Sequence, residues 1–300
     1  MEPRRLFYRR KNLIITNRAN LPQAMMNAVS NDGYRQTEGI SVTRLIDSPL
    51  VRHLRNLHHD DLEEDVSDRI WALFGQVVHT ILERANTTGM VEQRLYATVE
   101  GKTISGQFDH LENGILTDWK LTSVWSVVYG KTEWGKQLNV LAYLCRLKGL
   151  EVRQLQIIAM MRDWQKSKVE AEGNYPKTQV ITIPIEMWQP ERQEEYIKER
   201  LVAHYSNQPF CSDEERWKSE TKFAIMKRGR KSALRLLATN EEAIDWCKSN
   251  NYEIGKDGIY FETREGEYRR CENYCNVKQW CHLYAKIEDK DKNLSTMPEK

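Results

Sequence analysis

The order of helix and strand patterns in this 300-residue sequence predicts an α/β fold, a small sandwich of sheet and helices, followed by a smaller α+β unit. An amphipathic helical pattern at 67–86 precedes strand-like runs near 94–100, 102–111 and 115–121. A second helix pattern, 134–148, leads into further strand-like runs at 154–162 and 179–185. The composition changes at Asn207-Gln208-Pro209, which indicates a boundary.

The individual elements follow from local patterns. Residues 1–39 form a basic, weakly patterned arm, and a helix is expected from near Ser41 to near His58. Acidic residues 60–65 then form a linker to the long helix, whose apolar face comprises Ile70, Phe74, Val77, Val78, Ile81, Leu82 and Ala85. The second helix begins near Trp134 and ends before Gly149, and a charged helix over 190–205 completes a core at 40–208.

The dipeptide Asn113-Gly114 between two strand-like runs is a strong signal for a two-residue type I′ hairpin. In that register Asp109 lies opposite Asp118, and strand alternation places Lys120 on the same face as Asp118. Like charges directly opposite one another are destabilising. The sequence therefore predicts that the two aspartates hold a cation, with an ammonium group beside them.

The long helix contributes a possible third ligand. Gly75, His79 and Glu83 recur every four residues and form one stripe at the edge of the apolar face. Gly75 removes bulk where another group must approach closely, and His79 can offer a neutral imidazole nitrogen to a metal at the aspartates. The alternative for His79 is a histidine that borders the core.

These segments together resemble the PD-(D/E)XK nuclease superfamily, in particular its RecB/AddB-type branch, which includes phage exonucleases and CRISPR-adaptation nucleases. The matching pieces within residues 40–165 are Gly75-xxx-His79-xxx-Glu83, Gly106-xx-Asp109, Asp118-Trp119-Lys120, and Gln137 near the start of a helix. The resemblance implies a restriction-endonuclease-like central mixed sheet flanked by helices, Mg²⁺ or Mn²⁺ at the active site, and cleavage of DNA.

Chemistry assigns a role to each residue of this set. Asp109 and Asp118 offer the hard oxygen ligands that Mg²⁺ and Mn²⁺ prefer, and His79 would shift the preference towards Mn²⁺. Lys120 would orient the attacking water or stabilise charge on the phosphorane. A surface turn with exposed acids, and a solvated lysine, are the alternatives.

Gln137 is expected to contact the substrate or the active site, with a helix-surface position as its alternative. In the family a tyrosine follows this glutamine by four residues, but this sequence has Leu141 there. Tyr143 lies six residues after Gln137, about 120° away around the helix, and is expected to pack in the core or at its flank.

The cysteines of the C-terminal unit suggest a second metal site. Cys271, Cys275 and Cys281 lie within eleven residues, and in related nucleases such a set joins one further cysteine to hold a four-iron cluster. The spacing departs from that pattern, and no cysteine precedes Cys145. We expect Cys211 as the fourth ligand, with Cys247 or His282 as alternatives, and either a 4Fe-4S cluster or Zn²⁺ as the bound group. Cys247 and Cys145 are expected to pack in helices, and three reduced, unliganded thiols remain an alternative.

The charge distribution and the hydropathy limit the kinds of partner that are expected. The net charge of +2 says little, but Lys222, Lys227, Arg228, Arg230, Lys231 and Arg235 lie in a segment without an acid. Together with Arg4, Arg5, Arg9, Arg10 and Lys11 of the arm, they suit a polyanion, although a solvated basic face is an alternative. No run approaches 18 apolar residues, so no membrane span is expected, and the default compartment is the cytoplasm.

The sequence thus predicts a metal-dependent DNA nuclease, with exonuclease action favoured, that binds DNA without sequence specificity. It is built from a core at 40–208, a basic and cysteine-rich module at 209–286 and a disordered tail at 287–300. One alternative is a catalytically idle DNA-binding or assembly protein that retains the nuclease fold. Another is a metalloprotein centred on the cysteines, which leaves the opposed aspartates unexplained. No protein partner is indicated.

Overall fold

The structure, a computed structural model, describes residues 14–30, 38–85, 88–170, 173–256 and 258–295. The chain divides into two compact units between Phe210 and Cys211, next to the predicted boundary at Pro209. The five basic residues of the N-terminal arm, from Arg4 to Lys11, lie outside the described residues. Within the described part of the chain, no helix is long and apolar enough to cross a membrane.

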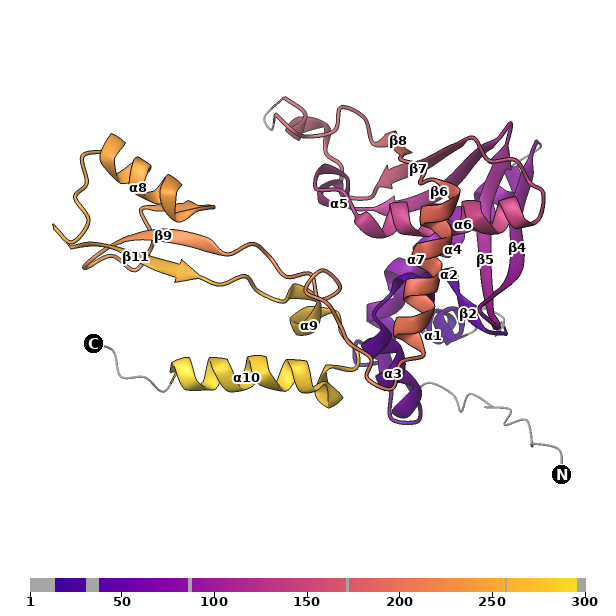
Figure 1. Ribbon diagram of the computed structural model, residues 1–300, viewed down its shortest axis with the longest axis horizontal. Coiled ribbons are helices and arrows are strands. Elements are labelled where there is room, and N and C mark those ends of the chain that lie inside the picture. The colour runs from indigo at the N-terminus through magenta and orange to yellow at the C-terminus, as the bar shows by residue number, and fades with distance from the viewer. Residues whose placement is uncertain (1–13, 31–37, 86–87, 171–172, 257, 296–300) are drawn as a thin grey trace. The chain divides into compact units, whose positions relative to one another are not determined.

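The first unit contains a six-stranded mixed sheet in the order β2-β5-β6-β7-β8, with β4 also paired to β5 (Figure 1). The pairs β2–β5 and β6–β7 are parallel, and the pairs β4–β5, β5–β6 and β7–β8 are antiparallel. The strands are β2 (Ile40–Ser41), β4 (Met90–Val99), β5 (Lys102–Glu112), β6 (Ile115–Thr122), β7 (Gln154–Met161) and β8 (Val180–Ile185). This confirms the predicted α/β fold with a mixed sheet flanked by helices.

Helix α6 (Thr132–Leu147) packs against this sheet, and α7 (Pro190–His204) packs against α6 (Figure 1). Nine residues of α6 are buried, and they share one core with β4, β5, β6 and β7. At Gly106 of β5 an added Cβ would lie 2.6 Å from a Leu141 methyl carbon and 2.7 Å from one of Val42. Gly106 therefore allows α6 and α2 (Val42–Ile46) to approach the sheet closely.

Helix α4 (Ile70–Ala85) follows a 3₁₀ turn at Val66–Arg69 and occupies the predicted position. Its burial differs from the expectation, because none of its residues is buried. Phe74, Val77 and Ile81 of the predicted core face expose 46%, 46% and 59% of their surface. A helical period tells which residues share a face but not whether another element covers it.

The N-terminal part of the unit is more structured than its composition predicts. β1 (Ile14–Thr16) pairs in parallel with β3 (Glu63–Asp65), and α1 (Gln23–Ser30) follows β1. The single helix expected from Ser41 is two helices, α2 and α3 (Pro49–Leu57), because Pro49 begins a new helix that Ser48 caps. Two short helical segments were not predicted, α5 (Val124–Val128) and the 3₁₀ turn Lys166–Lys168.

The second unit contains a three-stranded antiparallel sheet in the order β10-β9-β11. The strands are β9 (Lys222–Lys227), β10 (Arg235–Leu237) and β11 (Ile259–Arg264), and α8 (Asn240–Ser249) lies against β9 and β10 (Figure 1). Cys247 of α8 is buried beside Ile225 and Ile259, which confirms it as a packed core thiol.

The last elements are α9 (Arg269–Asn273), the 3₁₀ turn Lys278–Trp280 and α10 (His282–Ser295). The prediction of disorder from residue 287 is therefore wrong as far as residue 295, and residues 296–300 lie outside the described part. The segment 282–295 is polar but contains no glycine or proline, and its alanine, lysine, glutamate and leucine residues favour a helix.

Candidate active site

The predicted hairpin joins β5 to β6, the two strands that carry the paired aspartates. Asn113 and Gly114 both adopt positive φ angles, +50° and +75°, as a type I′ loop requires. The β5–β6 register pairs Glu112 with Ile115, Leu111 with Leu116 and His110 with Thr117. The next positions on this register are Asp109 and Asp118, and the Asp109 carboxylate accepts a 2.7 Å hydrogen bond from the Trp119 backbone N–H.

One group of side chains joins α4 to the sheet at Asp109. The Nδ1 atom of His79 lies 3.5 Å from Asp109 Oδ1 and 3.3 Å from Glu92 Oε1. Asp109 is buried, while His79 and Glu92 are partly exposed. His79, which could have been only a core-edge histidine, therefore points at a carboxylate pair.

Glu92 is the site residue that sequence reasoning missed. In the β4–β5 register its position is opposite Asp109, between the pairs Val91–His110 and Gln93–Phe108. Its φ angle of +47° lies in the left-handed region, which for a residue other than glycine costs roughly 1–3 kcal/mol. Only the strand register reveals this carboxylate, because Val91-Glu92-Gln93 carries no recognisable motif.

Further hydrogen bonds hold Glu92 in place. The Gln107 side-chain amide donates to Glu92 Oε2, and Arg94 donates to Gln107 Oε1 over 2.9 Å. Glu92 is thus oriented from β5 and from its own strand. Such outer contacts fix the direction of a ligand in metal sites.

A second group lies on β6 and α6. Lys120 Nζ is 2.6 Å from Asp118 Oδ2, so the predicted common face of these two residues is confirmed. Gln137 of α6 bridges them: its Nε2 donates to Asp118 Oδ1 over 3.0 Å, and its Oε1 accepts from Lys120 over 3.2 Å. Gln137 therefore lies at the site and not on an exposed helix surface.

The electrostatics reflect a crowded set of acids. Burial raises the pKa of Asp109 to about 7, and the nearby Asp118 charge acts in the same direction. The hydrogen bond to Glu92 raises the pKa of His79 above its usual value, against the effect of burial. Burial favours protonated Glu92, but hydrogen bonds from His79 and Gln107 outweigh it and hold the pKa of Glu92 below its usual value.

The side chains present fit a hard divalent cation. Among the described residues, one group of three or more His, Cys, Asp or Glu residues has ligand atoms all within 4.8 Å of one another, and it comprises His79, Glu92 and Asp109. Asp118 does not join this group and instead faces Lys120 and Gln137. Two carboxylates and one imidazole suit Mn²⁺, and the carboxylates alone suit Mg²⁺.

Three further expectations about the helices can be compared with the structure. Tyr143 is 5% exposed within the main core, which confirms that it packs there. At Gly75 an added Cβ would meet no atom within 4 Å, so the helix surface between Trp71 and His79 is open among the described residues. Buried Cys145 also packs in α6, and burial raises the pKa of its thiol to about 12.

The C-terminal cysteines lie in the second unit. Burial raises the pKa of Cys275, and the neighbouring thiols of Cys271 and Cys281 add to this effect. Cys211 and Cys271 are both buried. The backbone N–H of Arg270, the residue before Cys271, donates to the Arg216 carbonyl over 3.2 Å, and Arg216 lies five residues after Cys211. Among the described residues, no three of the four thiols have sulfur atoms all within 4.8 Å of one another.

The predicted basic segment forms the β9–β10 hairpin of the second unit. In this antiparallel hairpin, Arg235 pairs with Ile225 and Leu237 pairs with Phe223. Five of its six basic side chains are exposed and Lys227 is partly buried; the exposed ones are Lys222, Arg228, Arg230, Lys231 and Arg235.

No family model and no curated protein matches this chain. Among solved structures it is similar to the protein SSO0001, with 15% sequence identity, a TM-score of 0.45, and coverage of 64% of this chain and 88% of that chain. It is also similar to a phage-related exonuclease from Haemophilus somnus 129PT, with 16% identity, a TM-score of 0.26, and coverage of 61% and 78% of the two chains.

Proposed function

We propose that this protein is a metal-dependent DNA nuclease that hydrolyses phosphodiester bonds, with exonuclease action as the favoured mode. The observation that carries the proposal is the pairing of two groups at one site. His79, Glu92 and Asp109 offer cation ligands, and the triangle of Asp118, Lys120 and Gln137 holds an ammonium group beside them.

Each residue has a defined task in this proposal. His79, Glu92 and Asp109 would hold Mg²⁺ or Mn²⁺. The charge of Asp118, which acts on both Asp109 and His79, would add to the attraction for the ion. The bound ion would polarise the phosphate and lower the pKa of water. Lys120, fixed by Asp118 and Gln137, would stabilise negative charge that develops on the phosphate oxygens.

The alternative is a catalytically idle DNA-binding or assembly protein. The paired geometry disfavours it, because binding DNA alone gives no reason to bury Asp109 beside Asp118. Burial of like charges is costly unless a proton or a cation compensates it. The two functions differ in one measurable property, which is turnover.

The test compares linear and circular DNA, single- and double-stranded, in Mg²⁺, Mn²⁺ or EDTA. Loss of Asp118 or Lys120 as Asp118→Asn or Lys120→Ala should lower the cleavage rate at least about 100-fold, the scale of one transition-state donor. Lys148→Ala, an exposed lysine at the end of α6, serves as the matched control. Equal rates for all four proteins would reject the catalytic assignment, and cleavage of circular DNA would reject the exonuclease mode.

We further propose that Cys211, Cys271, Cys275 and Cys281 hold a metal group that stabilises the second unit. Support comes from the Cys271 and Cys281 thiols, which lie close enough to Cys275 to raise its pKa. The hydrogen bond from Arg270 to Arg216 also joins the segment of Cys271 to the one that follows Cys211. Anaerobically purified protein should absorb near ~400 nm if the group is a 4Fe-4S cluster and stay colourless with Zn²⁺. Metal analysis that finds neither iron nor zinc at stoichiometric levels would reject this site.

The exposed side chains of the β9–β10 hairpin would bind the DNA backbone without reading sequence. Neutralised phosphates release counterions, so the affinity should fall steeply with salt. Replacing Arg228, Arg230 and Lys231 by alanine should lower the slope of log K against log salt by roughly 3 units at most. An unchanged slope would assign DNA binding to another surface.

A further inference from the structure

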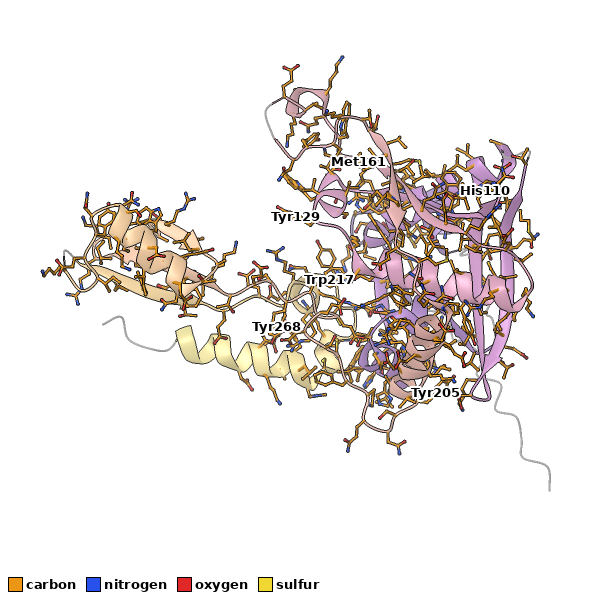
Figure 2. The ribbon with its side chains drawn as sticks, turned by 45° about the horizontal axis from the view of Figure 1, so that its top comes forward. His110, Tyr129, Met161, Tyr205, Trp217 and Tyr268 are labelled. Carbon is orange, nitrogen blue, oxygen red and sulfur yellow. The ribbon has the colours of Figure 1, made fainter. Side chains whose placement is uncertain are left out.

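Four exposed aromatic side chains of the first unit form two close pairs. Trp71 and Phe74 of α4 are 54% and 46% exposed, with ring centroids 5.6 Å apart. Trp125 and Tyr129, at α5, are 45% and 80% exposed and stack at 5.7 Å. Figure 2 shows Tyr129 at the edge of its unit. Large exposed aromatic surface of this kind marks a binding site more often than a solvated surface.

Backbone contacts bring these pairs to one end of the sheet. Arg162 follows β7, and its guanidinium lies 4.3 Å from the centre of the Trp71 ring. The Arg162 backbone N–H donates to the carbonyl of Thr122, the last residue of β6, over 2.9 Å. Asp163 then accepts a 2.8 Å hydrogen bond from the Val124 N–H at the start of α5. The beginning of α4, the end of β7 and α5 therefore meet.

This end of the sheet adjoins the candidate active site. Lys120 lies two residues before Thr122 on β6. On α4, Trp71, Gly75 and His79 form one stripe at intervals of four residues, which places Trp71 about 12 Å along the helix axis from His79. Between them, Gly75 leaves the helix surface open among the described residues. A DNA strand that leaves the candidate active site along this stripe of α4 would reach the aromatic side chains.

The chemistry of these side chains favours unpaired nucleobases as the occupant. Every base has an aromatic face that stacks on tryptophan or tyrosine, and a guanidinium adds cation–π and phosphate contacts. Bases inside a duplex are stacked on one another and are not available in this way. The carboxylate of Asp163, the acid adjacent to Arg162, is engaged at α5, so the ring-stacked cation is positioned to meet phosphate.

We propose that Trp71, Trp125, Tyr129 and Arg162 form a stacking shelf that binds the unpaired bases of single-stranded DNA next to the phosphodiester site. This inference rests on the proposed nuclease function and adds to it the strand that the enzyme accepts. A second copy of this chain is the other occupant that exposed rings of this kind could take, and the test below separates the two.

The experiment measures binding of a fluorescent oligothymidine single strand and of a matched duplex by anisotropy, in EDTA so that metal-dependent cleavage is absent. Trp125→Leu and Tyr129→Leu should each weaken single-strand binding at least about fivefold, since a base–aromatic stack contributes that much or more. Duplex binding should stay unchanged. Tyr129→Phe, which keeps the ring, should bind as the wild type does.

Tyr205 provides a matched control within the same unit. It is 42% exposed and has Arg52 at 5.1 Å and Lys102 at 4.4 Å from its ring, so its chemistry is similar. It lies at another end of the unit from Tyr129 (Figure 2). Tyr205→Leu should leave single-strand affinity unchanged. An oligonucleotide with abasic sites should bind the wild type as weakly as Tyr129→Leu binds the intact strand.

The outcomes separate the shelf from the nuclease proposal. If the wild type degrades DNA but the leucine variants keep single-strand affinity, the shelf is overturned and the nuclease stands. If no metal supports cleavage while the leucine variants lose affinity for single strands, the shelf stands and the nuclease fails. Loss of a dimer in light scattering, with unchanged single-strand affinity, assigns the rings to self-association and also overturns the shelf.

Discussion

Helices α6 and α4 have the same length, 16 residues, and opposite surroundings. Nine residues of α6 are buried, whereas α4 has none, although α4 carries as distinct an apolar pattern. Strands β4 to β8, α2 and α7 all contact α6. Each helix nevertheless delivers one side chain to the site, Gln137 from α6 and His79 from α4.

The difference suggests a division of tasks between the two helices. Packing around α6 fixes Gln137 and, through it, Asp118 and Lys120 in one geometry. In the proposed nuclease, the exposed surface of α4 would leave room for a substrate and would present aromatic rings to it. A site of this kind needs residues held precisely by packing, as around α6, and an exposed surface that a polymer can reach, as on α4.

The largest expected effect is the loss of stability when a buried side chain of α6 is shortened, compared with an exposed one of α4. Leu141→Ala in α6 removes a side chain that is 1% exposed, and should lower the free energy of unfolding by about 2–5 kcal/mol. Ile81→Ala in α4 removes a side chain that is 59% exposed, and should cost under about 1 kcal/mol. Chemical denaturation measures both. Similar losses for the two variants would mean that another part of the chain or a second copy covers α4.

The next effect is a pH dependence of stability that comes from a buried histidine of α7. His204 of α7 is 6% exposed, and its Nε2 donates to the Leu45 carbonyl over 2.9 Å. Its Nδ1 is buried without a hydrogen-bond partner among the described residues. Burial accordingly lowers the pKa of His204 to about 4, from an ordinary value of 6.5.

This depressed pKa has a definite consequence for stability. Between pH 6.5 and 4 the unfolded chain binds a proton at this position and the folded protein does not, so stability falls as the pH is lowered. The loss should approach about 3 kcal/mol, the product of the shift and 1.36 kcal/mol per unit. His204→Gln, which retains a donor and cannot be charged, should flatten the pH dependence of unfolding in that range. An unchanged slope in the variant would contradict this account.

The third effect concerns Glu92 at the proposed metal site. Glu92→Gln keeps the shape of the side chain and removes its charge, so the affinity for Mn²⁺ should fall roughly 10- to 100-fold. Isothermal titration with Mn²⁺ measures it without any cleavage. Glu83→Gln, an exposed glutamate one turn beyond His79, is the matched control. Equal affinities for the two variants would remove Glu92 from the ligand set.

Features that depend on residues close together in the sequence could be predicted, whereas features that depend on distant parts of the chain could not. The hairpin at Asn113-Gly114 and the shared face of Asp118 and Lys120 are local, since turn chemistry and strand alternation fix them. Glu92 could not be found in this way, because its place opposite Asp109 depends on the register of β4 against β5. The exposure of α4 was equally hidden, because a periodic pattern does not state what covers a face.

The smallest expected effect compares two glycines of the predicted motifs. Gly75→Ala should stabilise the protein by about 1 kcal/mol, because alanine favours a helix interior and its Cβ meets no atom within 4 Å. Gly106→Ala should destabilise it by about 1–3 kcal/mol, because its Cβ would lie 2.6 Å from Leu141. Thermal unfolding in both variants tests the pair. Destabilisation by Gly75→Ala would show that the strip between Trp71 and His79 is filled in solution, and a DNA strand would then need another route to the site.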